Sequence, residues 1–231
     1  SNFLTMRGFE QVRNDVCIQN QNVKLVGVGG GFKYSVLGPT HHGTEDIALM
    51  RILPNMKIAV PATPIEAFNI TKVVAHDNSP WYIRLEGTKE KELFDDSYQF
   101  EPGKGVIVSE GTDVTVMSIG SITYEVHEAV QILKEKGIHV RHVNMSSVKP
   151  IDTELVLDSA KNTDGIITVE EHNVIGGLGD AVAAVLVENN CQNIKLKKMG
   201  IRGHFVSEYG SQEYLRTIEG FSKEHIISNM Y

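Results

Sequence analysis

"VKLVGVGGGFKYSVLGPTHHGTEDIALMRILPNMKIAVPA", Val23 to Ala62, carries strand and helix patterns in direct succession. It begins with an apolar run closed by glycines, which is typical of a buried parallel strand. "EDIALMRIL" (45–53) then has apolar residues at helical spacing and ends before Pro54, which cannot continue a helix. "MKIAVPA" (56–62) follows as a second short strand. Strand, helix and strand in this order predict a parallel sheet with helices on its faces.

The same alternation continues on both sides of this stretch. Toward the C-terminus, Thr63 precedes Pro64 and stands three residues before Glu66, the spacing of a capped helix start, and "PWYIRLE" reads as a third strand. Toward the N-terminus, residues 1–22 have the pattern of a helix that feeds the first strand. Three strands are few for an open sheet covered on both faces, so we expect the chain to begin partway through a domain.

A change of composition divides the chain. The stretch from Gly87 to Lys104 is charged, is broken by proline and glycine and lacks a helical stripe, so it reads as a linker. Beyond it the alternation restarts, with strands at "DVTVMSIGS", "HVRHVNMS", "GIITVEE" and "IKLKKMGI" and helices at "TYEVHEAVQILKEKG", "DTELVLDSAK", "GDAVAAVLVEN" and in the tail. The predicted fold class is α/β, with two doubly wound domains at 1–87 and 105–231, a linker at 88–104, and the first domain incomplete.

Composition excludes several functional classes. The chain has 231 residues, 41% of them hydrophobic and 22% charged, which is ordinary for a globular protein. A net charge of −7 gives no basic field, so neither nucleic acid nor an anionic membrane is expected as a partner. No apolar run is long enough to span a bilayer, and the N-terminus lacks a secretory pattern. Cys17 and Cys191 form no motif and are predicted to be reduced thiols of a soluble, cytoplasmic protein.

Two adjacent histidines are the strongest chemical signal from residue type alone. His41 and His42 follow a strand and a glycine-rich loop, and ligands of open α/β sheets bind at that edge. An imidazole there either donates to a ligand and moves protons near neutral pH or only caps the next helix. "VGVGGG" lacks the Lys-Ser/Thr ending of a phosphate-binding loop, so we predict a close backbone turn there.

Three further features carry a structural and a functional alternative. "VEEHNVIGGLGDAV" (169–182) offers Glu170, Glu171 and His172 as metal ligands, but close packing at the glycines with the acids at a subunit contact is favoured. "MSIGS" leads into a helix whose N-terminus is able to hold an anion, although no basic residue stands beside it in the sequence. Trp81 and Tyr82 are predicted to be core residues.

A series of motifs resembles a known family. In order along the chain they are "NFLTMRGFEQVRNDV", "NVKLVGVGGG", "LGPTHHGTEDIALMRILPNMKIAVPATPIEA", "GTDVTVMSIGSITYEVHEA", "VKPID" and "TVEEHNVIGGLGDAVA". Together they resemble the C-terminal half of transketolase-like, thiamine-diphosphate-dependent enzymes, and above all the C-terminal subunit of split transketolases. The resemblance covers essentially the whole chain. It implies the later part of a pyrimidine-binding domain followed by a transketolase C-terminal domain.

The resemblance implies roles for particular residues. An aromatic residue of the family stacks on the aminopyrimidine ring of the cofactor, and Phe3 in "NFLT" matches it. The histidine of the "GPTH" motif lines the substrate channel and assists proton transfer, and His41 matches it. Arg7 and His42 are expected at the substrate site, with His42 behind His41.

Other family features are missing from this sequence. The glutamate that promotes activation of the cofactor lies upstream of the "NFLT" segment, and no metal motif of the diphosphate-binding domain occurs here. Leu37 stands where the family often has a sugar-binding aspartate, and a sugar-phosphate histidine is replaced near Gly29. The phosphate-binding arginine after the third strand has no match, since Arg84 is expected to point elsewhere. The usual pentose-phosphate substrates are therefore in doubt.

The resemblance implies transfer of a two-carbon ketol unit between sugars, in a homodimer or in a heterotetramer with an N-terminal transketolase subunit. Thiamine diphosphate with magnesium is expected in the complete enzyme, and neither is expected to bind to this chain alone. The alternatives are the beta-type subunit of a 2-oxoacid dehydrogenase, which shares both domains, and a dimerisation fragment without activity.

Overall fold

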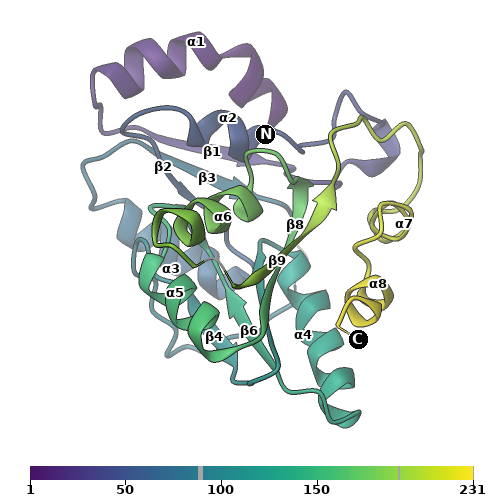
Figure 1. Ribbon diagram of the computed structural model, residues 1–231. Coiled ribbons are helices and arrows are strands. Elements are labelled where there is room, and N and C mark those ends of the chain that lie inside the picture. The colour runs from purple at the N-terminus through teal and green to yellow at the C-terminus, as the bar shows by residue number, and fades with distance from the viewer. Residues whose placement is uncertain (88–90, 192, 231) are drawn as a thin grey trace.

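The protein contains two sheets that lie one above the other (Figure 1). The computed structural model describes residues 1–87, 91–191 and 193–230. The first sheet has the strand order β1-β3-β2-β7, and the second sheet has the order β4-β6-β5-β8-β9. The strands of the first sheet are β1 (Lys24–Val28), β3 (Trp81–Leu85), β2 (Lys57–Ala59) and β7 (Ser147–Lys149), and those of the second are β4 (Val106–Ser109), β6 (Val140–Asn144), β5 (Val114–Ile119), β8 (Gly165–Asn173) and β9 (Lys195–Ile201).

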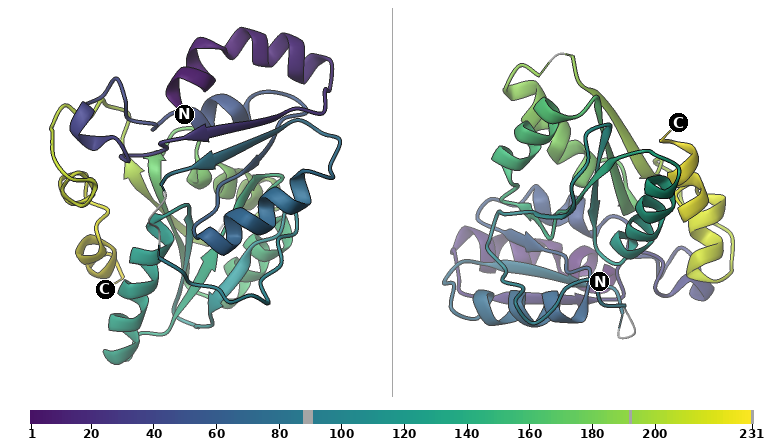
Figure 2. Two further views of the ribbon diagram at one scale, coloured as in Figure 1. Left: turned by 180° about the vertical axis from the view of Figure 1, so that it is seen from behind. Right: turned by 90° about the horizontal axis from the view of Figure 1, so that it is seen from below.

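Helices cover both faces of each sheet (Figure 2). A nearly continuous N-terminal helix comprises η1 (Phe3–Arg7), α1 (Phe9–Gln11) and η2 (Val12–Ile18), and it lies with α2 (Asp46–Arg51) on one face of the first sheet, opposite α3 (Pro64–Val74). On the second sheet, α5 (Thr153–Asn162) and α6 (Leu178–Glu188) lie opposite α4 (Ile122–Glu135), α7 (Gln212–Ile218) and α8 (Lys223–Ser228). A short turn of helix, η3 (Ser35–Leu37), follows β1.

The predicted α/β class and the alternation of strands and helices are confirmed. Thr63 caps α3 by accepting the amide proton of Glu66 at 3.3 Å, and α2 ends before Pro54, both as expected. Trp81 and Tyr82 are fully buried core residues. Cys17 and Cys191 are free thiols.

Two short strands were not predicted. β4 forms the antiparallel edge of the second sheet beside β6. β7 pairs antiparallel with β2, where Ile58 lies opposite Lys149, and so adds a fourth strand to the first sheet from the predicted second domain. Each strand has three or four residues, too few for a period of two to be visible in the sequence.

The predicted linker packs on the first sheet. Residues 88–90 of it lie outside the described residues, and 91–104 contain neither helix nor strand. Within this part, Tyr98 and Phe100 are buried in a cluster with Trp81. The linker is therefore partly a cover for the α3 face of the first sheet.

A shared core joins the two sheets. Its largest cluster contains Met50 and Ile58 from the first half of the chain and Met117 and Val182 from the second. Burial of apolar side chains from both halves in one cluster is the main force that holds the sheets together. Among the helices that the structure describes, none combines the length and apolar character needed to cross a membrane.

Candidate functional site

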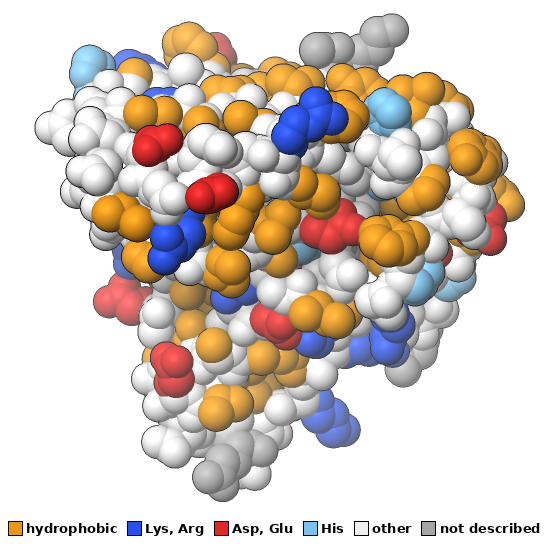
Figure 3. Space-filling view, turned by 90° about the horizontal axis from the view of Figure 1, so that it is seen from above, with side chains coloured by type: hydrophobic (Ala, Val, Ile, Leu, Met, Phe, Trp, Pro, Cys, Tyr) orange, Lys and Arg blue, Asp and Glu red, His pale blue; other side chains and the backbone are white. Residues whose placement is uncertain are grey.

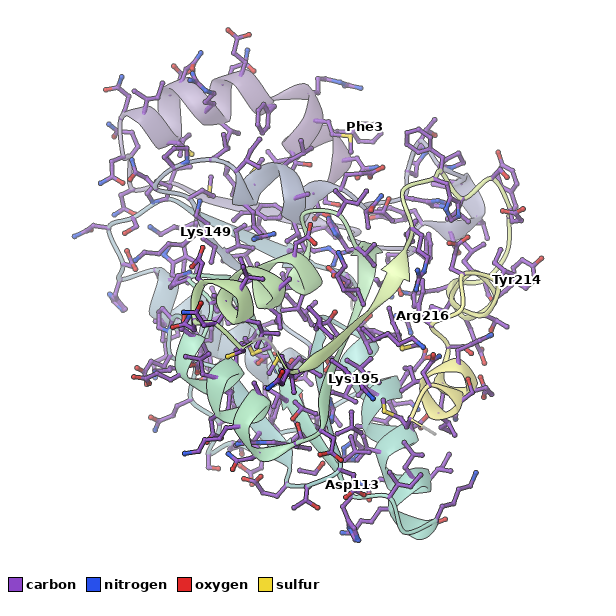
Figure 4. The ribbon with its side chains drawn as sticks, in the orientation of Figure 1. Phe3, Asp113, Lys149, Lys195, Tyr214 and Arg216 are labelled. Atoms are coloured by element: carbon purple, nitrogen blue, oxygen red, sulfur yellow. The ribbon has the colours of Figure 1, made fainter. Side chains whose placement is uncertain are left out.

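Phe3 and His41 lie side by side at the carboxyl end of the first sheet. Phe3 is the first residue of η1, while His41 belongs to the turn Gly38–Gly43, here called the His41 turn. Their rings meet edge to face with centroids 5.6 Å apart. The Phe3 side chain is 55% exposed, and it projects near the outer start of the N-terminal helix (Figure 4). An exposed aromatic ring next to an imidazole offers a stacking surface and a proton-transfer group at one place.

Arg7 lies on the exposed side of this pair, and His42 lies on its buried side. The Arg7 guanidinium carbon lies 5.1 Å from the centroid of the Phe3 ring, one helical turn away, and its side chain is exposed. The His42 side chain is 3% exposed; its Nε2 lies 3.2 Å from the Ser35 carbonyl, and its ring contacts Phe32. The structure therefore brings Phe3, Arg7 and His41 together at the surface and places His42 inside, behind them.

The His41 turn is fixed locally by hydrogen bonds. The His41 amide donates to the Gly38 carbonyl at 2.9 Å, and His41 Nδ1 lies 3.0 Å from the Thr40 hydroxyl. The Asn2 side-chain amide donates to the His42 carbonyl, and its Oδ1 is buried without a partner. Asn2, the residue before Phe3, thus links the start of the N-terminal helix to the His41 turn.

The glycine loop Gly29–Phe32 uses its amides within the protein. The Gly29 and Gly30 amides both donate to the Leu85 carbonyl, the Gly31 amide donates to the Gly43 carbonyl, and the Phe32 amide donates to the Glu171 carboxylate. These amides are not available to cradle a phosphate group. The predicted close backbone turn is therefore confirmed.

Two buried charges explain why positions 30 and 31 of this loop are glycines. A Cβ atom on Gly30 would lie 2.2 Å from Arg84 Nε, and one on Gly31 would lie 2.2 Å from Glu171 Oε1. Gly31 also has a φ of +61°, a backbone angle that residues other than glycine rarely adopt. The loop thus allows two charged side chains to approach the backbone closely.

Arg84 is the centre of a buried ion-pair network beneath the site. Its guanidinium lies 3.2 Å from Asp46 and 2.9 Å from Glu86, and its Nη2 also donates to the carbonyls of Gly43 and Glu171. Burial alone would lower the pKa of Arg84, but the carboxylates of Asp46 and Glu86 raise it above its usual value, so the guanidinium stays charged. Arg84 points into the interior, as expected.

The acidic motif near the end of β8 has a different role from the one predicted. Glu170, Glu171 and His172 are fully buried within the chain, so the expectation that the acids lie at a subunit contact is wrong. The Glu170 carboxylate accepts the amides of Leu178 and Gly179 at the start of α6, where a negative charge is favourable. The described residues contain no group of three or more His, Cys, Asp and Glu side chains suited to a metal ion.

The N-terminus of α4 is occupied by the protein itself. The Ser121 amide donates to the Glu86 carboxylate at 2.8 Å, and the Ser121 hydroxyl accepts from Arg216 at 2.9 Å. The sequence argued against an anion site here because no basic residue is nearby along the chain. The missing base is Arg216, which comes from α7.

Sequence reasoning missed the charged residues that support the site. Asp46, Arg84 and Arg216 were not expected to lie near the His41 turn. The available signal was an arginine inside the apolar run "WYIRL", because a charge in a buried strand requires a buried partner.

The residues present fit the pyrimidine end of a thiamine cofactor. Phe3 offers an exposed aromatic face for a flat heteroaromatic ring, and His41 lies at its edge. The surface seen from above, which carries the N-terminal helix, has apolar side chains spread over much of it (Figure 3).

Two family models match the chain. The model described as "Transketolase, pyrimidine binding domain" matches residues 1–89, and the one described as "Transketolase, C-terminal domain" matches residues 103–226. Both descriptions name transketolase, not 2-oxoacid dehydrogenase.

Individual relatives show the same likeness. The chain is 38% identical to a protein of Actinobacillus succinogenes described as a subunit of apulose-4-phosphate transketolase, over 97% of this chain and 72% of the relative. It is 36% identical to "Putative transketolase C-terminal section" of Methanocaldococcus jannaschii, over 94% of this chain and 68% of the relative. Among solved structures, it is similar to one described as "Split gene transketolase, inactive beta4 tetramer", with a TM-score of 0.87, 38% identity, and coverage of 99% of this chain and 71% of that one.

Proposed function

The chain belongs to the transketolase family, and we propose that it acts as the C-terminal part of a thiamine-diphosphate-dependent enzyme that transfers a two-carbon ketol unit between sugars. The observation that carries this proposal is the contact between Phe3 and His41 at the carboxyl end of the first sheet. It combines a ring-stacking surface with a proton-transfer group in a chain related to transketolase subunits.

Each residue of the proposed site has a distinct task. Thiamine diphosphate, when bound, supplies the nucleophile and the electron sink for breaking and forming the carbon–carbon bond. Phe3 holds the pyrimidine ring by stacking. His41 holds or moves a proton at a sugar oxygen, and Arg7 orients the sugar from the other side of Phe3. His42 supports the His41 turn from inside through its contacts with Phe32 and Ser35.

A second subunit completes the active site. We infer that an N-terminal transketolase subunit holds the diphosphate and its magnesium ion, and that this chain alone binds the cofactor weakly or not at all; the relatives described as transketolase subunits support this division of the enzyme. The assembly is a homodimer of complete protomers or a heterotetramer of the two subunits. The "inactive beta4 tetramer" of the related split-gene protein supports the need for a partner.

We also propose the domain division that the sequence predicts, with 1–87 and 105–231 separated by the segment 88–104. The family models support this division, because one ends at residue 89 and the other begins at residue 103.

The test of this function is His41→Ala in the complete enzyme. We expect turnover to fall by roughly 10²- to 10⁴-fold, the usual loss when a positioned acid–base group is removed. Cofactor affinity should change much less, because stacking on Phe3 is retained. Steady-state kinetics with a ketose donor and titration of the cofactor separate the two quantities.

His42→Ala is the matched control. Because His42 is buried and contacts protein groups, its loss should lower the thermal stability more than it lowers turnover of the folded enzyme. Normal turnover by folded His41→Ala would show that His41 is a packing residue and would refute the proposed site.

A further inference from the structure

The second half of the chain reaches into the His41 turn through one buried carboxylate. Glu171 on β8 is fully buried, and its Oε1 accepts the Phe32 amide at 2.5 Å and the Gln212 side-chain amide at 2.8 Å. Its Oε2 accepts from Nε of Arg216. A carboxylate removed from water requires such partners, so each contact fixes where the others lie.

The Phe32 amide lies directly beside the backbone that carries His41. Gly31, the preceding residue, pairs with Gly43 in both directions, with each N–H donating to the other's carbonyl at 2.8 Å. Gly43 stands two residues after His41. The Glu171 carboxylate therefore holds one side of a two-residue bridge whose other side is the end of the His41 turn.

Arg84 holds the other side of the same bridge. Its Nη2 donates to the Gly43 carbonyl at 3.0 Å and to the Glu171 carbonyl at 2.9 Å. The backbone of Glu171 and the backbone of the turn are thus fixed to one guanidinium. The Glu171 carboxylate thus holds the Gly31–Phe32 side of the bridge, and the Glu171 carbonyl holds the Gly43 side through Arg84.

Arg216 sets the position of the Glu171 carboxylate from α7. It lies between that helix and the second sheet (Figure 4), where it also pairs with Glu125 and donates to Ser121. Arg216 bonds Glu171 and Glu125 through different nitrogens. Glu125 shares the arginine with Glu171 but belongs to α4, away from the glycine loop, so it provides a matched control.

We propose that Glu171, held by Arg216, is a positioning residue for the His41 turn, so that the C-terminal half of the chain contributes to catalysis. The inference rests on the proposed function of His41. Without the Glu171 carboxylate, the Phe32 amide loses its charged acceptor and the bridge to Gly43 is free to shift. A displacement of about 1 Å at a reacting group is able to cost roughly 10²-fold in rate.

The test compares Glu171→Gln with Glu125→Gln in the complete enzyme with its N-terminal subunit, thiamine diphosphate and magnesium. Both variants remove one carboxylate from Arg216 and keep the size of the side chain. We expect Glu171→Gln to lower kcat by roughly tenfold or more and Glu125→Gln to lower it by less than about twofold. Equal effects on kcat would show that Glu171 only stabilises the fold and would overturn the proposal.

A double-mutant cycle with His41→Ala separates a positioning role from a general one. If Glu171 acts through His41, adding Glu171→Gln to His41→Ala should lower kcat by less than about twofold further. Additive losses would overturn the inference while leaving the function of His41 intact. Full turnover by His41→Ala would instead refute the proposed function itself.

Hydrogen exchange in the isolated chain provides a readout that needs no activity. In Glu171→Gln, the peptide containing the Phe32 amide should exchange faster than in wild type, and in Glu125→Gln it should not. Unchanged exchange at Phe32 in folded Glu171→Gln would contradict the proposed hold on the glycine loop.

Discussion

At the scale of single residues, the outer and the buried side chains of the site have different roles. Phe3 is exposed and His41 is partly exposed, and their rings meet edge to face. Arg84 and Asp46 are fully buried and pair with each other, and Arg84 also donates to backbone carbonyls. Under the proposed function, Phe3 and His41 act on the cofactor and the sugar, and the buried charges fix the backbone beside the His41 turn.

Phe3→Ala should weaken cofactor binding by the complete enzyme roughly tenfold or more, since loss of ring stacking and its buried area costs at least about 1.4 kcal/mol. Turnover at saturating cofactor should fall less, because His41 remains. Ile18→Ala is the control: it removes another exposed apolar side chain, 58% accessible, at the far end of the same helical segment. An unchanged dissociation constant for Phe3→Ala, measured by calorimetric titration, would remove Phe3 from the cofactor site.

At the scale of elements, the glycine loop is shaped by what approaches it from the second half of the chain. Its sequence resembles a phosphate loop, but its amides bind the Leu85 and Gly43 carbonyls and the Glu171 carboxylate. The spacing of glycines correctly indicated a tight turn. It gave no information about Glu171, which lies 139 residues from Phe32.

Gly31→Ala should destabilise the chain by roughly 2–4 kcal/mol, because a left-handed backbone and a forced displacement of Glu171 both add to the cost. Gly137→Ala is the matched control. Gly137 also has a positive φ, +80°, but a Cβ atom there would meet nothing within 4 Å. That change should cost only about 1–2 kcal/mol. If urea unfolding shows the same loss of unfolding free energy for both variants, Glu171 moves aside without cost and does not restrict the loop.

The packing of α4 on β6 predicts a pH dependence of stability. Burial, together with the nearby His127, lowers the pKa of His142 to about 3. The unfolded chain takes up a proton at His142 below about pH 6.5, whereas the folded chain excludes it down to the lowered pKa. The free energy of unfolding should therefore fall as the pH drops through this window, by up to about 1.4 kcal/mol per pH unit from this group.

His142→Gln should remove this contribution. Urea unfolding at about pH 5 and about pH 6.5 measures the slope for wild type and variant. The change in unfolding free energy per pH unit should differ between wild type and variant by close to the value for one proton, about 1.4 kcal/mol. If they coincide, His142 takes up its proton equally in the folded and unfolded states.

At the scale of the whole molecule, sequence periodicity predicted most of the fold. Long helices such as α4 and parallel strands such as β5 carry their pattern locally, so their positions were confirmed. β7 was missed because it is short and its partner β2 lies far away in the sequence. The buried position of Glu171 was also missed, since its acidic neighbours look like surface charge until Arg84 and Arg216 are placed beside them.

The most direct measurement is ketol transfer after mixing. Turnover of a ketose donor and an aldehyde acceptor is measured, with thiamine diphosphate and magnesium, for this chain, for the N-terminal transketolase subunit of the same organism, and for both together. We expect turnover only in the mixture, and a loss of roughly 10²- to 10⁴-fold when the mixture contains His41→Ala. Turnover by this chain alone, or a mixture that is equally active with His41→Ala, would contradict it.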